Sequence, residues 1–199
     1  MKLWDPRNLE APSLRMVPEP GQARKQCWSV CQSQPNSEDS QEHFVAAGFD
    51  NGDIKVFDVR NSKIAWETSL SRGISKLTII SLNNDNKSES KLLAGSVQGR
   101  LYSWSIRKPE DTPQQIQLDK STIWEAVKLS NNKNLALTAL GSGAMTLVDL
   151  DKGNVNTILS HQVSEPPLNC LSVSRDKPGL VATSSFDQTL RLFYYTGMK

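Results

Sequence analysis

The chain has 199 residues, 37% hydrophobic and 22% charged, a composition typical of a soluble globular protein long enough to bury a core. Its 23 basic and 21 acidic residues leave a net charge of +2 and are spread along the sequence. We therefore expect no nucleic-acid partner, because such proteins usually carry a basic stripe. We also expect no membrane partner, because no apolar run approaches the roughly 20 residues that a spanning helix needs.

The first predicted strand is KLWD (2–5), and the same kind of segment recurs four more times. The later copies are GDIKVFD (52–58), GRLYSWS (99–105), GAMTLVD (143–149) and QTLRLFY (188–194). Their alternation of apolar and polar residues is typical of a strand with two different faces. The key residues, spaced by 53, 47, 44 and 45 positions, are Trp4, Phe57, Trp104, Val148 and Phe193. This period is close to the roughly 40–45 residues of a four-stranded β-propeller blade.

Further strands are predicted around each of the last four segments. An apolar run lies upstream across a short polar turn, which predicts a hairpin; the runs are FVAAGF (44–49), KLLAGSV (91–97), LALTALG (135–141) and LVATSSF (180–186). Still earlier strands are CWSVC (27–31), KLTIISL (76–82), IWEAVKL (123–129) and LNCLSV (168–173). A fourth strand follows, as in IAWETSL (64–70) and VNTILS (155–160). No segment shows sustained helical spacing, so the predicted fold class is all-β.

This pattern resembles the WD-repeat β-propeller family over essentially the whole chain. SSFDQTLRLF (184–193) is similar to the strand pair S-x-D-G-T-I-R-L-W of that family. The chain departs from the family in two ways: only Trp4 and Trp104 keep the tryptophan, and no repeat opens with Gly-His. The hydrogen-bond network that the family builds from Asp, His, Ser and Trp is therefore incomplete in every repeat.

The resemblance implies a domain organisation by blades. We expect a partial blade at 1–20, complete blades at 21–72, 73–119 and 120–161, and a last blade at 162–199 that lacks its outer strand. That is about four and a half blades of a ring that is seven-bladed by resemblance. The chain then begins inside a blade, as a truncated polypeptide or an incomplete gene model. The alternative is a four-bladed ring in which residues 12–17 dock onto the final blade.

Nothing in the sequence predicts a catalytic, cofactor or metal site. The three cysteines are an odd number, which suits a reducing compartment, and we expect a cytoplasmic protein. Cys27 and Cys31 stand four residues apart in one strand, so they should share a face at a separation of roughly 13 Å. That separation is too large for a disulfide or for one zinc ion. His43 and His161 are far apart in the sequence and have no ligand-type neighbour.

Six residues are candidates for contacts with a protein partner: Trp28, Trp124, Phe49, Asp50, Phe186 and Asp187. Trp28 and Trp124 take matching places near the start of an inner strand, which in a propeller lies at the mouth of the channel. Amphipathic aromatic residues on a rim are frequent anchors for a bound segment. The alternative interpretations are that both tryptophans pack between blades and that Asp50 and Asp187 cap their own turns.

The opening phrase has a second interpretation. An aromatic residue followed by Asp-x-Arg at the end of a strand resembles the motif by which some propellers dock onto cullin-type ubiquitin ligases. By that resemblance the docking residues are Asp5, Arg7, Asp58 and Arg60. The simpler alternative is a local Asp–Arg pair at the turn, which contributes little at a surface.

A closer resemblance concerns function. The segments LWDPRN, CWSV, AAGFDNGDIKVFDVRN, WET, KSTIWE, LTA and SSFDQT follow one another in the order found in WD-repeat factors for assembly of axonemal dynein. This resemblance implies a non-enzymatic cytoplasmic scaffold. Its protein partners would be an Hsp90-linked co-chaperone assembly with prefoldin-like and AAA-ATPase components, together with dynein heavy chains. The alternative function is a substrate receptor for a cullin-type ubiquitin ligase.

Overall fold

The computed structural model describes residues 2–15, 21, 23–33, 43–84, 87–108, 110–129, 134–150 and 155–196. Every helix or strand assigned within these ranges is a β-strand, which confirms the all-β prediction. None of the described segments forms a helix that could cross a membrane.

The strands form small antiparallel sheets, and in each sheet the strands pair in chain order. A two-stranded hairpin comes first, made of β1 (Lys2–Leu3) and β2 (Leu14–Arg15). The first four-stranded sheet contains β3 (Cys27–Gln32), β4 (Phe44–Phe49), β5 (Asp53–Asp58) and β6 (Lys63–Ser69). The second contains β7 (Ile74–Asn84), β8 (Lys87–Ser96), β9 (Arg100–Ser105) and β10 (Gln114–Gln117).

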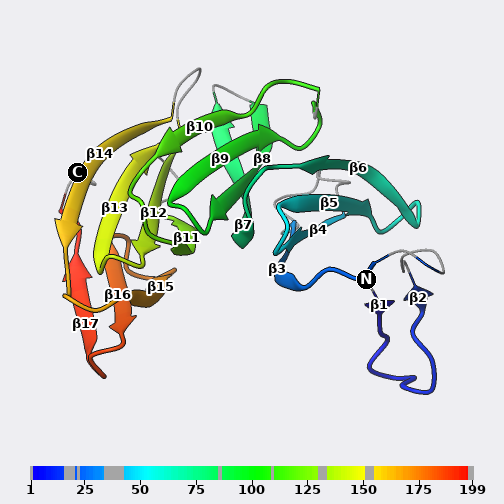
Figure 1. The fold of residues 1–199 in the computed structure, drawn as a ribbon, viewed down its shortest axis with the longest axis horizontal. Coiled ribbons are helices and arrows are strands. Elements are labelled where there is room, and N and C mark those ends of the chain that lie inside the picture. The colour runs from blue at the N-terminus through cyan, green and yellow to red at the C-terminus, as the bar shows by residue number, and fades with distance from the viewer. Residues whose placement is uncertain are drawn as a thin grey trace.

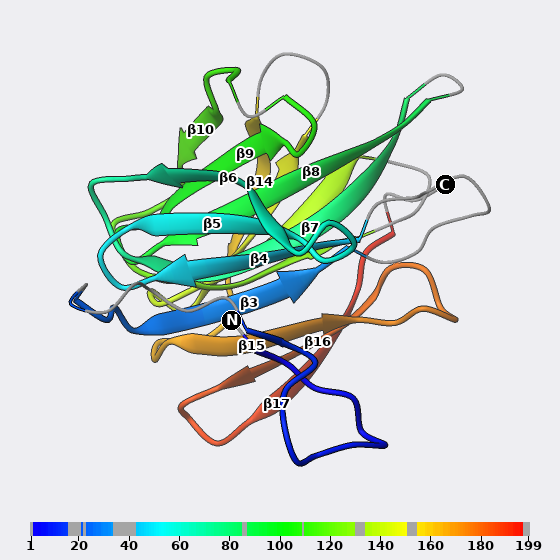
Figure 2. The same cartoon turned by 90° about the vertical axis from the view of Figure 1, so that its right-hand side faces the viewer.

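The third four-stranded sheet contains β11 (Ile123–Lys128), β12 (Leu135–Leu140), β13 (Ala144–Asp149) and β14 (Asn156–Gln162). The last sheet has three strands, β15 (Leu168–Val173), β16 (Leu180–Ser185) and β17 (Leu190–Tyr194). β7 and β8 are the longest strands, and their hairpin extends beyond its neighbours (Figure 2).

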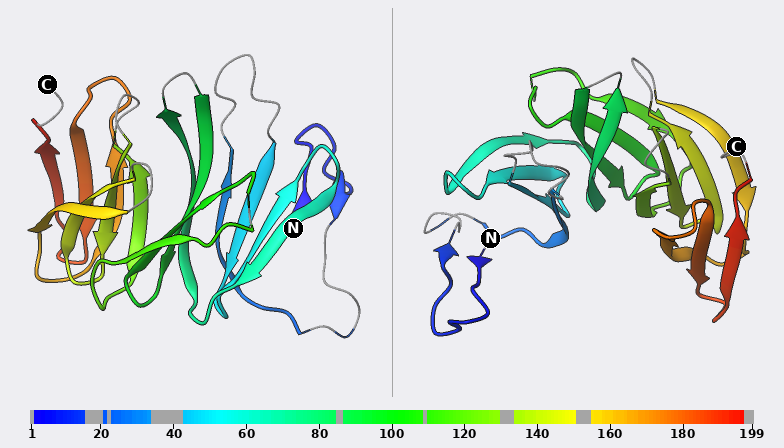
Figure 3. Two further views of the ribbon diagram at one scale, coloured as in Figure 1. Left: turned by 90° about the horizontal axis from the view of Figure 1, so that it is seen from above. Right: turned by 180° about the vertical axis from the view of Figure 1, so that it is seen from behind.

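The sheets stand side by side in an arc, an arrangement that fits propeller-like blades (Figure 1). The strands β3, β7, β11 and β15 lie next to one another on the inner side, and β6, β10 and β14 lie on the outer side (Figures 1 and 3). The described residues do not close a ring, because the hairpin and β17 end up at opposite ends of the arc (Figure 1).

The alternative of a four-bladed ring is wrong in this structure. Leu14 and Arg15 pair with β1, and not with β17. Residues 16 and 17, the rest of the segment expected to dock, lie outside the described residues. β17 consequently pairs with β16 alone among the described strands.

The apolar core is divided among the junctions between neighbouring sheets. One cluster joins the first and second four-stranded sheets and contains Val56 and Leu77. Another joins the second and third and contains Leu101 and Ile123, and a further cluster joins the third sheet to the last. Burial of each such side chain is worth about 1.5–3 kcal/mol. Each sheet therefore depends on its neighbours, as in other repeat proteins.

Close approach of two sheets requires a residue without a side chain at one position of β4 and of β8. A Cβ atom added at Gly48 would lie 2.6 Å from Cγ2 of Ile74 in the next sheet. A Cβ atom added at Gly95 would lie 2.8 Å from Cβ of Ile123. Both distances are shorter than real contacts, so the isoleucine of the following sheet occupies the space that a side chain would need.

The turn that enters β5, β9, β13 or β17 has the same backbone geometry in all four sheets. Gly52, Gly99 and Gly143 occupy its left-handed position with φ of 96°, 72° and 82°. In the last sheet Gln188 holds φ of 63° there. Glycine adopts this conformation freely, whereas a residue with a Cβ pays roughly 1–2 kcal/mol. The last sheet therefore keeps the turn without the residue that favours it.

Substituting Gly48→Ala should lower the free energy of unfolding by about 1–3 kcal/mol, because the added methyl group collides with Ile74. Urea unfolding of the four members of a double-mutant cycle with Ile74→Ala checks the cause. The cost of Gly48→Ala should be smaller when Ile74 is already alanine. Strictly additive effects would contradict the proposed contact.

Candidate protein-binding surface

A register shift occurs at the start of every inner strand, and it sets up the rim of the arc. The pairing jumps from Cys27 to Ser29 in β3, from Ile74 to Lys76 in β7, from Ile123 to Glu125 in β11 and from Leu168 to Cys170 in β15. The skipped residues are Trp28, Ser75, Trp124 and Asn169. Such an irregularity increases the local twist and changes the direction of a side chain. All four sheets thus share one device that turns a side chain out of the ladder.

The two tryptophans at this position are partly open to solvent. Trp28 is 50% exposed and Trp124 is 40% exposed, so neither is enclosed between two sheets. The indole N–H of Trp28 donates to Oε1 of Gln26 at 3.4 Å. Trp124 lies against the turn of the same sheet, with its indole nitrogen beside Gly141. Both side chains present an aromatic face together with a polar edge.

The structure does not bring the two tryptophans into one cluster. β7 lies between their strands, since it packs against both β3 and β11. Ser75, the corresponding residue of β7, is half-buried, and its hydroxyl donates to the carbonyl oxygens of Ile123 and Gly95 at 2.7 and 3.0 Å. The hydrogen bond from Ser75 to Ile123 joins the second four-stranded sheet to the third, at the level of the two tryptophans.

Phe49 and Asp50 lie in the turn beside Trp28. The Asp50 carboxylate accepts a hydrogen bond from the backbone N–H of Gln26 at 3.2 Å, and the backbone N–H of Asp50 donates to the carbonyl of Gln26 at 3.0 Å. Gln26 therefore links this turn to the indole of Trp28. Asp50 is exposed, whereas Phe49 is half-buried.

Phe186 and Asp187 lie in the corresponding turn of the last sheet, and they differ in how far the protein itself engages their side chains. Phe186 is exposed. The Asp187 carboxylate accepts from the backbone N–H and the hydroxyl of Thr189 at 3.0 and 2.6 Å and pairs with Arg191 at 2.6 Å. The hydrogen bond from the Arg191 guanidinium lowers the pKa of the Asp187 carboxylate most, and the hydrogen bond from the Thr189 hydroxyl comes second. Together they hold this pKa well below its ordinary value. This geometry is that of a turn cap.

The two Asp-x-Arg phrases fold differently. Arg7 donates to both carboxylate oxygens of Asp5, through Nε at 3.0 Å and Nη2 at 2.8 Å, so they form the local pair. Asp58 instead accepts from the backbone N–H and side-chain amide of Asn61 at 3.0 and 2.6 Å. The Arg60 side chain is exposed. The repeated sequence therefore does not give a repeated arrangement of charge.

The cysteine geometry corrects one expectation from the sequence. Cys27 and Cys31 do not share a face of β3, because the register shift at Trp28 intervenes: Cys27 pairs with Phe49, and Cys31 pairs with Ala46. Cys31 is half-buried against the next sheet, and burial raises the pKa of its thiol to about 12. Cys27 and Cys170 are exposed free thiols.

The histidines lie apart from each other and from any cluster of potential metal ligands. The rings of His161 and Phe193 form a T-shaped pair with centroids 6.3 Å apart, and His43 is exposed before β4. Among the described residues no group of three or more His, Cys, Asp or Glu side chains is placed to hold a metal ion.

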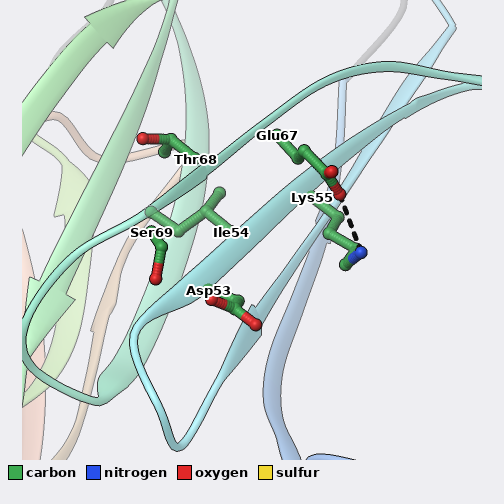
Figure 4. Close-up of a pocket in the computed structure, with 6 residues that line it drawn as sticks. All are labelled: Asp53, Ile54, Lys55, Glu67, Thr68 and Ser69. Atoms are coloured by element: carbon green, nitrogen blue, oxygen red, sulfur yellow. Dashed lines mark hydrogen bonds and ion pairs between the residues drawn. The ribbon is translucent and has the colours of Figure 1, made fainter. Parts of the chain in front are cut away.

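An open hollow lies on the outer strands of the first four-stranded sheet (Figure 4). It is lined by Asp53, Ile54, Lys55, Glu67, Thr68 and Ser69. Lys55 and Glu67 point toward each other across its edge and form an ion pair at 2.7 Å (Figure 4). Hydrogen bonds from the side-chain amide of Asn51, which has the larger effect, and from the hydroxyl of Ser69 lower the pKa of the Asp53 carboxylate. These charged groups are engaged with the protein itself.

Comparison with known proteins relates the whole chain to one set of proteins. It is 34% identical to dynein axonemal assembly factor 10 of Homo sapiens over 219 aligned positions, 98% of this chain and 59% of that protein. It is 33% identical to the Xenopus laevis protein of that name, over 98% of the chain and 59% of that protein. The protein of that name from Chlamydomonas reinhardtii is 26% identical, over 96% of the chain and 58% of that protein. These proteins are homologues of the chain.

The predicted relation to dynein assembly factors is thereby confirmed, and the chain spans less than two thirds of the length of these relatives. No family model matches the chain, so membership of the WD-repeat family stays a prediction.

The solved structures that share the fold include two computationally designed proteins. The computationally designed Ika4 protein matches with a TM-score of 0.66 and 16% identity, over 87% of this chain and 94% of that chain. The computationally designed Ika8 protein matches with a TM-score of 0.64 and 17% identity, over 85% of this chain and 46% of that chain.

Substituting Asp187→Asn should make the chain less sensitive to acid. The folded state lowers the pKa of Asp187, so its stabilising contribution is present above the unfolded value near pH 4 and disappears as the pH falls. The urea midpoint should therefore drop less between pH 7 and pH 3 in the variant than in the unaltered chain. Between pH 7 and pH 8 the two midpoints should change in parallel. An equal drop of the urea midpoint in both proteins on acidification would contradict a stabilising role for the ionised Asp187 carboxylate.

Proposed function

We propose that the chain is a non-enzymatic adaptor in the cytoplasmic assembly of axonemal dynein, and that its sheets are blades of a WD-repeat β-propeller. The observation that supports this most is that its similarity to dynein axonemal assembly factor 10 extends over 98% of the chain. The chain covers 59% of the length of the human relative. That the chain shares the activity of that whole protein is therefore part of our proposal.

The rim supports the adaptor role on physical grounds. The same strand irregularity places a tryptophan at the rim of two sheets and leaves each partly exposed. A rigid sheet that presents aromatic residues can bind a partner segment with little loss of conformational entropy. The exposed Phe186 adds a third aromatic side chain, at the turn that enters β17 in the last sheet.

By resemblance, the proposed partners are an Hsp90-linked co-chaperone assembly, with prefoldin-like and AAA-ATPase components, and dynein heavy chains. We propose Trp28, Trp124 and Phe186 as contact residues. Asp50 and Asp187 would support them by fixing the turns, since their carboxylates already accept hydrogen bonds from Gln26 and Thr189.

Replacing Trp28 and Trp124 together with alanine should weaken partner binding by about 10–100-fold, the range for loss of aromatic anchors. Tagged protein expressed in ciliated cells and quantitative mass spectrometry of the co-purified AAA-ATPases and dynein heavy chains measure the effect. Ile158→Ala is the matched control, because Ile158 is an exposed apolar residue on the outer strand β14. Equal capture by the tryptophan variant and the control would overturn the proposed surface.

The second candidate function, a ligase substrate receptor, rests on the exposed side chain of Arg60. Asp58 is occupied by Asn61, so the Arg60 guanidinium remains available to a partner carboxylate. Arg60→Glu should abolish capture of a cullin adaptor and leave capture of co-chaperones unchanged. Recovery of co-chaperones without any cullin adaptor from the unaltered chain would exclude this function.

A further inference from the structure

The second and third four-stranded sheets each stand between two other sheets, so the exposure of their rim does not come from a missing neighbour. Their inner strands β7 and β11 lie side by side (Figures 1 and 3). The linker that enters each strand carries one exposed cation, Arg72 before β7 and Lys120 before β11. Trp124, 40% exposed, lies at the start of β11. These three residues are here called the central rim.

Hydrogen bonds through Val97 hold the two linkers against one turn. The backbone N–H of Val97 donates to the carbonyl of Gly73 at 3.0 Å, and the carbonyl of Val97 accepts from the hydroxyl of Thr122 at 3.1 Å. Gly73 directly follows Arg72, and Thr122 lies two residues after Lys120. Both cations therefore project from backbone that the protein itself fixes, which reduces the entropy lost when a partner binds.

Trp124 is fixed at its backbone and free at its polar edge. The hydroxyl of Ser75 donates to the carbonyl of the preceding residue, Ile123, at 2.7 Å. Within the described part of the chain, the indole N–H of Trp124 has no hydrogen-bond acceptor, whereas that of Trp28 donates to Gln26. The central rim thus offers an aromatic face and an unused donor together.

The two cations of the central rim are unpaired. No ion pair or hydrogen bond among the described residues involves the side chain of Arg72 or Lys120. The nearby Asp119 carboxylate is engaged with its own linker, because it accepts from the backbone N–H of Lys120 at 2.5 Å and from the hydroxyl of Ser121 at 3.0 Å. The guanidinium and the ammonium group consequently remain available to anionic groups of a partner.

Positive charge dominates this part of the rim. The linkers and turns of the second and third four-stranded sheets carry three cations and one acid: Arg72, Arg100, Lys120 and Asp119. Lys76 and Glu125, just inside the two inner strands, neutralise each other in an ion pair at 2.6 Å. Charge complementarity therefore favours an acidic partner over a basic one.

We propose that the central rim binds an extended peptide segment that is rich in Asp and Glu and carries an aromatic residue. This rests on the proposed adaptor role, because the same rim is the surface that would hold the partner. Carboxylates of the segment pair with Arg72 and Lys120 and accept from the indole N–H of Trp124, and its aromatic ring packs on the indole face. The two cations belong to different sheets and do not form the cluster typical of phosphate recognition. Separate carboxylates fit this spacing better.

Fluorescence anisotropy with a labelled twelve-residue peptide of six Glu, two Phe and four Gly tests the proposal. The full chain should bind it saturably at about 50 mM NaCl and more weakly at about 500 mM, because salt screens exposed charges. A peptide with Gln in place of Glu should bind at least about 10-fold more weakly. The proposal is wrong if the glutamate peptide does not bind at about 1 mM protein, which is the limit of useful affinity. It is equally wrong if the glutamine peptide binds as tightly.

A phosphorylated peptide tests the assignment to carboxylates. Three phosphoserines in place of the six Glu give a similar total charge. This peptide should bind no more tightly than the glutamate peptide. Tighter binding would show that the central rim prefers phosphate and would overturn the assignment.

Reversing both cations should raise the dissociation constant of the glutamate peptide at least about 10-fold in Arg72→Glu with Lys120→Glu. Arg60→Glu with Lys63→Glu is the matched control, because it changes the net charge equally at exposed residues beside the turn from β5 to β6. The control should bind as the unaltered chain does. The urea midpoint of the first variant should stay unchanged, since neither side chain is paired in the protein. Equal weakening in both variants would contradict the site.

Two substitutions of Trp124 separate its face from its donor. Trp124→Phe keeps an aromatic face without the N–H and should weaken peptide binding about 2–10-fold, the value of one hydrogen bond. Trp124→Ala removes both and should weaken it about 10–100-fold. If Trp124→Ala binds the glutamate peptide as tightly as the unaltered chain, the proposed site is wrong.

Capture from ciliated cells separates this proposal from the adaptor role. If the Trp28 and Trp124 variant loses co-chaperones and dynein heavy chains while Arg72→Glu with Lys120→Glu retains them, the acidic segment is wrong and the adaptor role stands. If the unaltered chain captures neither, yet binds the glutamate peptide with the expected effects of the variants, the adaptor role is wrong and the acidic segment is supported.

Discussion

Apolar contact between neighbouring sheets is the interaction on which this structure depends. A sheet of three or four short strands buries little surface by itself, so its stability comes from the sheets on either side. Val56 with Leu77 and Leu147 with Leu171 fill two of these junctions, and Gly48 lets the sheets approach closely enough for the contact to form. The same logic leaves an apolar face at each end of the arc, because the end sheets have one neighbour fewer.

The irregularity at the start of the inner strands connects this packing to the proposed binding rim. It brings Ile74 and Leu77, three residues apart, onto the face that packs against the preceding sheet, and it turns the residue in between out of the ladder. Where that residue is Trp28 or Trp124, an aromatic side chain reaches the rim. Where it is Ser75, the hydroxyl binds the next sheet instead. One backbone feature therefore serves the core in the three later sheets and the surface in two.

Copies of a repeated phrase have diverged in the interactions they make. Asp5 pairs with Arg7, whereas Asp58 accepts hydrogen bonds from Asn61. The turn before β17 holds Gln188 in the left-handed conformation that glycine adopts in the other three sheets, and the Asp187 carboxylate secures that turn through Thr189 and Arg191. Local hydrogen bonds can thus maintain a turn after the residue with the favourable backbone preference has been replaced.

The sequence by itself determined the strands and the turns between them, because alternation and turn residues such as Gly52 and Gly143 act within a few positions of the chain. It also determined the relation to dynein assembly factors. Only the tertiary structure decided the register shift at Trp28, which places Cys31 on the opposite face from Cys27, because a shift exists only relative to a paired strand. Exposure was decided there too: Val56 and Leu192 have equivalent places in the repeat, and one is buried solely because another sheet stands against it.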